Sequence, residues 1–174
     1  MPRQITTEVL IHAPPAQVWG MLTDFNALGD WAPFFESIAG NLDVGSRLVV
    51  KFRNGMTARP VITEFVPGAV LEWRGKLAFR WLVDACHRFA LVPEGNATRL
   101  LHTEEFKGIL VPLLGGMLRK TKHEFEAFNL ALKARAESLQ QRGKGSVCPI
   151  GIHPRSFPTH LTLGWKSFFT CQVI

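Results

Sequence analysis

The pattern of apolar and polar residues predicts a strand followed by two short helices at the start of the chain. From Ile5 to Ile11 apolar and polar residues broadly alternate, as in a strand with one buried face, and the run ends at Pro14-Pro15. The stretch from Pro15 to Leu22 has a proline in its first turn and apolar residues at helical spacing. A second short helical segment, Phe25 to Trp31, follows directly.

Beyond Pro33 the pattern changes to short apolar runs separated by turns. Dipeptides that favour tight turns, such as Asn54-Gly55, Pro67-Gly68 and Glu94-Gly95, divide these runs. The predicted strands are Phe34 to Ala39, Arg47 to Phe52, Thr57 to Phe65, Val70 to Arg74, Trp81 to Val92 and Thr98 to Phe106. Six consecutive strands joined by tight turns form an antiparallel meander.

The last strongly patterned segment, Leu110 to Glu137, is an amphipathic helix. Charged residues lie mostly between apolar residues that recur at helical spacing. These apolar residues are Leu114, Met117, Leu118, Phe125, Phe128 and Leu132. The Gly115-Gly116 pair near its start lowers helix stability by roughly 1 kcal/mol per glycine, and indicates a kink, a frayed first turn or a close backbone approach. One long helix behind a sheet lies across it, and a curved sheet leaves room for an apolar cavity beneath. The pattern therefore predicts an α+β fold that holds a hydrophobic molecule.

Composition narrows the class of protein. A chain of 174 residues is long enough to form one domain that buries roughly two-thirds of its unfolded surface, and its 47% hydrophobic share is ordinary. No apolar run reaches the length of a bilayer span, and residues 1–10 lack the layout of a secretory signal, so we expect a cytoplasmic protein without integral membrane association. The net charge of +6 comes from scattered basic residues, which does not favour nucleic acid as a partner.

The sequence contains no motif of nucleophilic or metal-dependent chemistry. Cys86, Cys148 and Cys171 lie at no metal-ligand spacing, and their odd number does not suggest a disulfide framework. A glycine-rich phosphate loop, a His-x-x-x-His pair and a Gly-x-Ser-x-Gly elbow are also absent from the sequence. We therefore expect neither a metal nor a cofactor.

The chain changes character after residue 142. Pro149, Pro154 and Pro158 interrupt the segment 143–174, whose apolar residues follow neither period for long. We predict a domain at residues 1–142 and a poorly ordered C-terminal extension at 143–174. The alternative is that apolar clusters in this extension dock a protein partner. The sequence does not indicate an oligomeric state.

The hairpin of the last two predicted strands carries candidate chemistry. A two-residue turn at Glu94-Gly95 pairs His87 with His102, and alternation then directs both imidazoles and the Glu104 carboxylate into the apolar interior. A histidine with an ordinary pKa of about 6.5 can move protons at neutral pH, and a carboxylate can orient it. If the protein is an enzyme, these three residues are the candidate catalytic group. Alternatively, they form a buried polar network or bind the head group of a ligand.

Aromatic residues supply the candidate ligand contacts. The chain has no tyrosine, so aromatic contacts come from phenylalanine and tryptophan. The candidate cavity-lining residues are Trp31, Phe34, Phe35, Phe52, Trp73, Trp81, Phe89, Phe106, Phe125 and Phe128. Together they predict a wide aromatic interior.

The order of elements and several local sequences resemble one known superfamily. These sequences are Ile11-His12-Ala13-Pro14-Pro15-Ala16-Gln17-Val18-Trp19, Leu22-Thr23-Asp24-Phe25 leading to Trp31, the hairpin Phe89 to Leu100, and His102 to Gly108 before the final helix. Over roughly residues 4–138 the chain is similar to the polyketide cyclase/dehydrase and lipid-transport superfamily, which has the START-like helix-grip fold. The tail after Arg142 departs from that pattern.

The resemblance implies a seven-stranded curved antiparallel sheet that grips the long helix, with two short helices closing one end of an interior cavity. Similar proteins bind lipids, sterols, polyketides or plant hormones, and some cyclise or dehydrate aromatic polyketides. Because one fold supports many functions, three alternatives follow. The expected function is binding of a small or medium hydrophobic ligand. The second is a cyclase or dehydratase in which His87 or His102 is the general base and Glu104 its partner. The third is a protein-interaction module.

Overall fold

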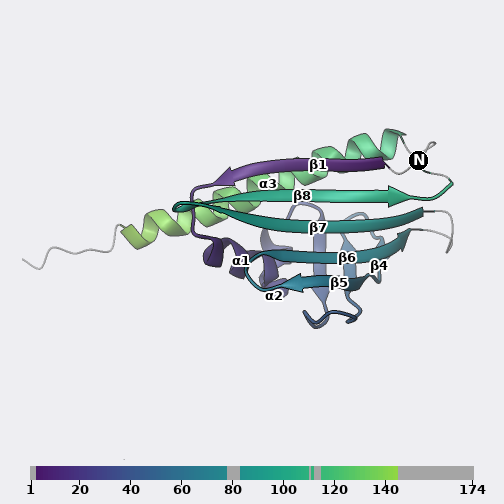
Figure 1. The fold of residues 1–174 in the computed structure, drawn as a ribbon, viewed down its shortest axis with the longest axis horizontal. Helices are drawn as coiled ribbons and strands as arrows, with labels where there is room; N and C mark the ends of the chain where they lie inside the picture. Colours follow the sequence, from purple (N-terminus) through teal and green to yellow (C-terminus); the bar gives the residue numbers. More distant parts are fainter. Residues whose placement is uncertain (1–2, 78–82, 110, 112–114, 145–174) are drawn as a thin grey trace, which may run out of the picture.

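A computed structural model describes residues 3–77, 83–109, 111 and 115–144 (Figure 1). Its elements are β1 (Arg3–Ile11), α1 (Pro15–Thr23), α2 (Phe25–Trp31), β2 (Phe35–Ala39), β3 (Val49–Phe52), β4 (Thr57–Ala58), β5 (Val61–Val66), β6 (Val70–Leu77), β7 (Val83–Glu94), β8 (Ala97–Lys107) and α3 (Gly115–Lys144). The strands form two antiparallel sheets, one in the order β1-β8-β7-β6-β5 and one in the order β2-β3-β4. The predicted α+β class, with a long C-terminal helix on an antiparallel sheet, is confirmed.

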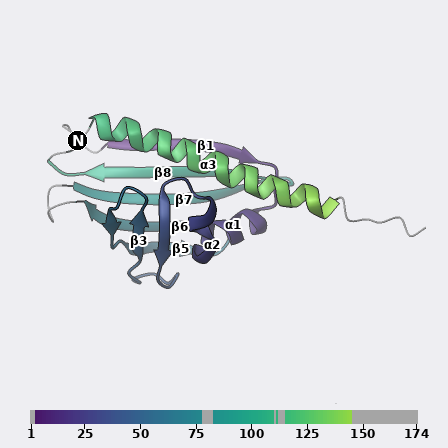
Figure 2. The ribbon, with the colours of Figure 1, turned by 180° about the vertical axis from the view of Figure 1, so that it is seen from behind.

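The two sheets and the long helix form a layered structure around one interior. Figure 2 shows α3 running obliquely across one face of the five-stranded sheet, with the small sheet β2-β3-β4 on the same side. Helices α1 and α2 lie on that side too, between the small sheet and the C-terminal half of α3 (Figures 1 and 2). The large sheet thus has one covered face and one open face, which is why its strands alternate between buried and exposed residues.

The strand count differs from the prediction. The segment Thr57 to Phe65 was predicted as one strand, but it divides into β4 and β5, which belong to different sheets. Pro60 lies at the break, where it has no N–H to donate to a ladder while its carbonyl accepts the N–H of Leu48 at 2.8 Å. The protein therefore has eight strands in its described residues, where seven were predicted.

Glycine allows α2 to approach the small sheet closely. A Cβ atom at Gly29 would lie only 2.2 Å from the backbone oxygen of Glu36, so no other residue fits without moving the backbone. The Asp24 side chain caps the start of α2 by accepting the N–H of Ala27 at 3.3 Å. At the other end the Arg53 guanidinium donates to the carbonyl oxygens of Gly29 and Ala32. These contacts fix α2 against β2 and β3.

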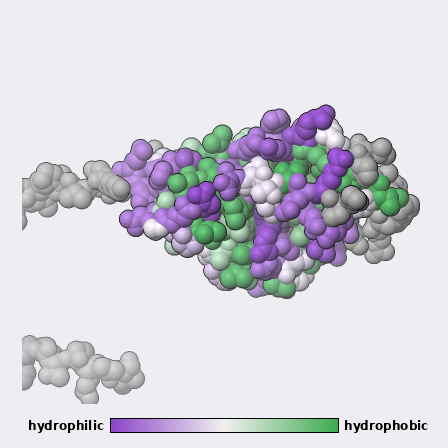
Figure 3. Space-filling view, turned by 45° about the horizontal axis from the view of Figure 1, so that its top comes forward, coloured by the Kyte–Doolittle hydropathy of each residue, from purple (hydrophilic) through white to green (hydrophobic). Residues whose placement is uncertain are grey.

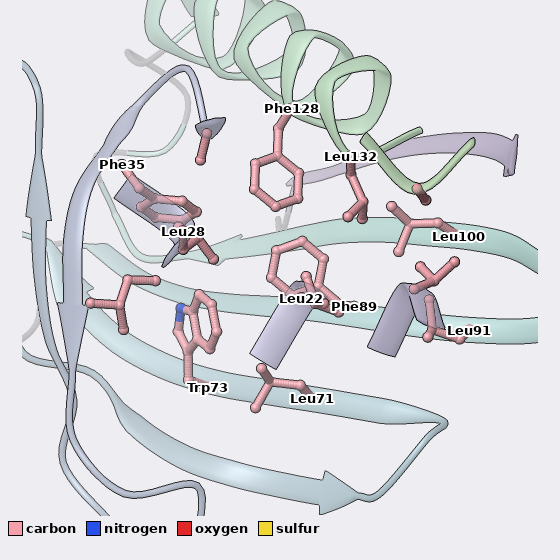
Figure 4. Close-up of a cluster of buried hydrophobic side chains, with 14 of the residues drawn as sticks. Leu22, Leu28, Phe35, Leu71, Trp73, Phe89, Leu91, Leu100, Phe128 and Leu132 are labelled. Carbon is pink, nitrogen blue, oxygen red and sulfur yellow. The ribbon is translucent and has the colours of Figure 1, made fainter. Parts of the chain in front are cut away.

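The main core fills the space between α3 and the large sheet. Figure 4 shows Phe128 and Leu132 of α3 pointing toward Phe89, Leu91 and Leu100 of β7 and β8. Leu22, Leu28, Phe35, Leu71 and Trp73 complete the cluster from the short helices, β2 and β6. All ten of these side chains are at most 7% exposed, so apolar burial stabilises the docking of every layer on the others.

One face of the molecule carries many polar residues. Figure 3 shows hydrophilic residues spread over the viewed face, with smaller apolar patches between them. On α3, Lys120 and Lys122 each face a glutamate four residues later at 3.8 Å, an arrangement that favours a solvent-exposed helix face. None of the helices in the described ranges is long and apolar enough to cross a bilayer. The predicted extension at residues 143–174 lies outside the described residues, apart from the end of α3.

Candidate ligand-binding site

A cavity of about 490 Å³ lies between the large sheet, the small sheet and the first half of α3. The strands β6, β7 and β8 form one wall and β2, β3 and β4 another. The apolar lining consists of Phe34, Phe35, Val50, Phe52, Met56, Ala58, Pro60, Trp73, Ala85, Phe106, Met117 and Phe125. A volume of this size is typical of small-molecule sites, in which apolar walls surround a few polar groups.

The structure places six of the predicted aromatic contacts on the cavity wall. These are Phe34, Phe35, Phe52, Trp73, Phe106 and Phe125. Three others do not line it: Phe89 and Phe128 are at most 1% exposed in the core, and the Trp31 ring packs on Phe128 at 5.2 Å between centroids. Phe89 and Phe128 belong instead to the main core cluster, and Trp31 packs against it. Trp81, the remaining candidate, is outside the described residues.

The register of the β7–β8 hairpin differs from the prediction. His87 pairs with Glu104 and Phe89 with His102, so the predicted pairing of His87 with His102 was wrong. The turn lies at Gly95 and Asn96, one residue later than expected, because Glu94 and Ala97 close the hairpin as its last pair. Moving the turn by one residue shifts every pair by two positions, which keeps each side chain on its original face.

The predicted polar residues therefore do come together, in a different arrangement. His87 and Glu104 line the cavity, whereas His102 lies behind His87 and is fully buried. The His87 ring stacks on Trp73 at 4.8 Å between centroids, and the His102 ring stacks on Phe125 at 3.7 Å. These aromatic partners fix the orientation of both imidazoles.

A chain of hydrogen bonds links the two histidines to the N-terminal strand. Nε2 of His87 and Nε2 of His102 lie 2.9 Å apart, and Nδ1 of His102 lies 2.9 Å from Oδ1 of Asn129. Asn129 Nδ2 donates to the Thr7 hydroxyl at 3.0 Å, and that hydroxyl donates to the backbone oxygen of His102 at 3.2 Å. At the cavity end, Nδ1 of His87 lies 3.7 Å from Oε1 of Glu104. The chain thus runs from a buried threonine to the cavity.

Sequence reasoning missed Thr7 and Asn129, although both carry a signal. Thr7 occupies the inward position between Ile5 and Val9 on a strand whose alternate residues are buried. Asn129 lies on the apolar face of α3, four residues after Phe125 and three before Leu132. A polar residue at a buried position of an apolar stripe needs a hydrogen-bond partner, so each position pointed to an interior network.

Burial keeps His102 neutral. Desolvation and the neighbouring His87 imidazole together hold the pKa of His102 well below its ordinary value of 6.5, outweighing the hydrogen bond that His102 donates to Asn129. At physiological pH the ring therefore carries one proton. As a neutral group it can donate through one nitrogen and accept through the other.

The buried neutral His102 predicts a loss of stability in mild acid. Above pH 6.5 the histidine is neutral in both the folded and unfolded states; below it, the unfolded chain gains a proton that folded His102 does not take up. The free energy of unfolding should then fall by about 1.4 kcal/mol per pH unit from this residue, down to the folded pKa. Urea denaturation between pH 7.5 and 5 measures this slope.

Two variants isolate this effect from other titrating groups. His102→Gln should show a shallower pH dependence than wild type by that amount, whereas His123→Gln should parallel wild type because His123 is 80% exposed. Parallel curves for wild type and His102→Gln would contradict the assignment of a neutral buried imidazole.

Polar residues that are partly exposed also line the cavity. Lys120, Thr121 and Glu124 of α3 and Asn54 of the β3–β4 turn lie on its rim. Lys120 and Glu124 face each other at 3.8 Å. Within the described ranges, no group of three or more histidine, cysteine, aspartate or glutamate side chains is arranged to hold a metal ion. The site is thus an apolar chamber with a polar rim and a buried polar end.

Comparisons with known proteins agree with this architecture. Residues 2–137 match the family described as polyketide cyclase / dehydrase and lipid transport. No curated protein matches the sequence.

Several solved structures share the fold at low sequence identity. Protein MLL2253 from Mesorhizobium loti aligns with a TM-score of 0.64 at 22% identity, over 80% of this chain and 98% of its own. A START superfamily protein from Mycobacterium smegmatis aligns with a TM-score of 0.63 at 19% identity, over 78% and 98%. The di-domain ARO/CYC StfQ from the steffimycin biosynthetic pathway gives 0.66 at 13% identity, over 81% of this chain and 52% of its own.

Proposed function

The chain belongs to the polyketide cyclase / dehydrase and lipid transport family, and we propose that it binds one small or medium hydrophobic molecule in the cavity beneath α3. The observation that carries this proposal is a cavity of about 490 Å³ with aromatic walls. Transfer of apolar ligand surface from water contributes roughly 25 cal/mol per Å², which supplies most of the affinity. Lipids, sterols and polyketide-like molecules have this character.

The distribution of polar groups supports a ligand with distinct ends. His87 and Glu104 lie at the sheet wall, whereas Lys120, Thr121 and Glu124 lie on the helix at the rim. Aromatic rings line the cavity walls between these two groups of polar residues. A molecule with an apolar body and one polar group fits both the aromatic walls and the polar residues at the sheet wall. Burial of its apolar body provides most of the affinity, and a few polar contacts fix its orientation.

A second candidate function is cyclisation or dehydration of a ketone-containing substrate. The supporting observation is that His87 and Glu104 both line the cavity, with Nδ1 of His87 3.7 Å from the Glu104 carboxylate. In such a reaction His87 removes a proton from the carbon next to a carbonyl group. The imidazolium that results, held by the neighbouring Glu104 carboxylate, returns this proton to the leaving hydroxyl, which departs as water. The same two residues thus serve binding or catalysis.

Native mass spectrometry of the purified full chain tests ligand binding directly. A co-purifying lipid, sterol or polyketide-like compound that dissociates on activation and is recovered by organic extraction is the expected result. A protein that is empty as purified and takes up none of a panel of such compounds would contradict the binding proposal.

Leucine substitutions at two alanines of β7 test where the ligand binds. Ala85 is buried on the cavity wall, whereas Ala90 lies on the opposite face of the same strand. Ala85→Leu fills part of the cavity and should weaken ligand binding at least about tenfold, since overpacking costs roughly 1–3 kcal/mol. Ala90→Leu should leave affinity within about twofold of wild type. Binding titrations on both variants make the comparison, and equal affinities would place the ligand elsewhere.

A further inference from the structure

We propose that the polar end of the cavity binds a hydrogen-bond donor, namely a hydroxyl or amino group on an otherwise apolar ligand, and excludes a carboxylate. The inference rests on the proposed ligand-binding function and adds the chemistry of the ligand's polar group. It follows from the direction in which the hydrogen bonds of the buried chain run.

Thr7 sets this direction. Its hydroxyl has a single hydrogen, which it donates to the backbone oxygen of His102, so its oxygen accepts from Asn129 Nδ2. The Asn129 amide, oriented in this way, presents Oδ1 to the ring of His102 at 2.9 Å. Oδ1 can only accept. Nδ1 of His102 therefore carries the ring proton.

The two imidazoles transmit the direction to the cavity. Since neutral His102 has its proton on Nδ1, its Nε2 accepts a hydrogen bond. The partner at 2.9 Å is Nε2 of His87, which must therefore be the donor. In a neutral ring this leaves the lone pair on Nδ1 of His87. That nitrogen belongs to a residue of the cavity wall and is the last atom of the chain.

The position of Glu104 agrees with this assignment independently. A protonated Nδ1 bonded to a carboxylate oxygen would lie about 2.7–2.9 Å from it. The observed separation of 3.7 Å between His87 Nδ1 and Glu104 Oε1 is too long for a hydrogen bond, as expected between two acceptors. The other charged groups of the cavity lining, Lys120 and Glu124 of α3, face each other at the rim.

Two acceptors side by side select the ligand. A hydroxyl or amino group donates to Nδ1 of His87, and an amino group has a further hydrogen for Glu104. A ligand carboxylate adds negative charge next to Glu104 and is repelled, while an ether offers no hydrogen to either acceptor. Buried acceptors left without a donor cost free energy, so the site discriminates by hydrogen-bond polarity as well as by shape.

Four compounds on one naphthalene skeleton test this selection in the full-length protein. By titration calorimetry, 2-naphthol or 2-(aminomethyl)naphthalene should bind at least about tenfold more tightly than 2-methoxynaphthalene, and 2-naphthoate should bind weakest. The better of the two donors identifies the polar group as hydroxyl or amine. Equal affinity for the naphthol and its methyl ether, or tight binding of naphthoate, would overturn the inference.

Thr7→Val and Thr7→Ser form a matched pair for the positioning role of Thr7. Valine keeps the branched shape but removes the hydroxyl that orients Asn129, so the preference for the naphthol over its ether should fall to about twofold or less. Serine keeps the hydroxyl and should retain the wild-type preference. Loss of the preference in Thr7→Ser alone, or its retention in Thr7→Val, would contradict the assigned role.

Nitrogen NMR of the imidazole rings tests the polarity without any ligand. Two-bond proton–nitrogen spectra of the ¹⁵N-labelled full chain at pH 8 should show the proton on Nδ1 in His102 and on Nε2 in His87. The opposite tautomers would mean that the chain ends in a donor toward Glu104, and would overturn the inference. If no naphthalene compound binds, the ligand-binding proposal loses support while these tautomers still decide the polarity.

Discussion

Replacement of Phe128 by alanine is expected to lower the free energy of unfolding by about 3–5 kcal/mol, as is usual for loss of a fully buried phenylalanine. Its side chain is 0% exposed and contacts rings from α2, β2 and β7. Figure 4 shows Phe128 pointing from α3 into the core, above Phe89. The phenyl ring thus joins the long helix to both sheets, and its removal leaves a cavity that the surrounding rigid strands cannot fill. Urea denaturation followed by circular dichroism measures the change.

Leu130 provides the control for this prediction. It lies two residues further along α3 and is 61% exposed, so Leu130→Ala should change the free energy of unfolding by less than about 0.5 kcal/mol. If both variants lose similar amounts, helix propensity rather than core packing controls the stability of α3. A loss below about 1.5 kcal/mol in Phe128→Ala would show that the helix is not packed on the sheets as described.

The sequence predicted the elements well because most of them bury only one face. Phe125, Phe128 and Leu132 recur at helical spacing since α3 touches the sheets along one stripe. Buried and more exposed residues alternate along β7 and β8 because these strands also bury only one face. The break at Pro60 was missed because each half of Thr57 to Phe65 keeps an apolar pattern, and only the partners of the two halves differ.

The register of the β7–β8 hairpin depends on which two residues form its turn, and the local sequence allows two choices. Both Glu94-Gly95 and Gly95-Asn96 are plausible two-residue turns, but the observed turn has φ of 60° at Gly95, its first central residue. Glycine at the first central position suits the primed turns of two-residue hairpins, which need positive φ there. Because the resulting shift is two residues, His87 and Glu104 remain on the inner face despite the wrong pairing.

The interior network lay beyond a sequence-only prediction. Thr7 and Asn129 are 122 residues apart and meet only because α3 crosses β1 and β8 at this point. The cavity likewise depends on where the small sheet sits against the large one, which no local pattern specifies. The sequence identified the two histidines as inward-facing, but which of them reaches the cavity depends on this packing.

The largest functional effect is expected from His87→Gln. Glutamine keeps an amide N–H for His102 Nε2 but has no nitrogen that can take up a proton. Turnover of a ketone substrate by cyclisation or dehydration should therefore fall about a hundredfold or more, the usual contribution of a general base. Affinity for the same compound should change less than about tenfold, since one hydrogen bond contributes only a small part of the binding. Single-turnover kinetics and binding titrations on the same samples measure both quantities.

His123→Gln is the matched control, because it makes the same chemical change at an exposed histidine and should alter neither quantity. Wild-type binding without any turnover, unchanged in His87→Gln, would assign the protein to ligand carriage and His87 to head-group contact. Turnover that survives in His87→Gln would show that another group removes the proton. A carrier and an enzyme share the apolar cavity, so the use of the His87 lone pair distinguishes them. In a carrier it orients the ligand, and in an enzyme it also accepts a proton from carbon.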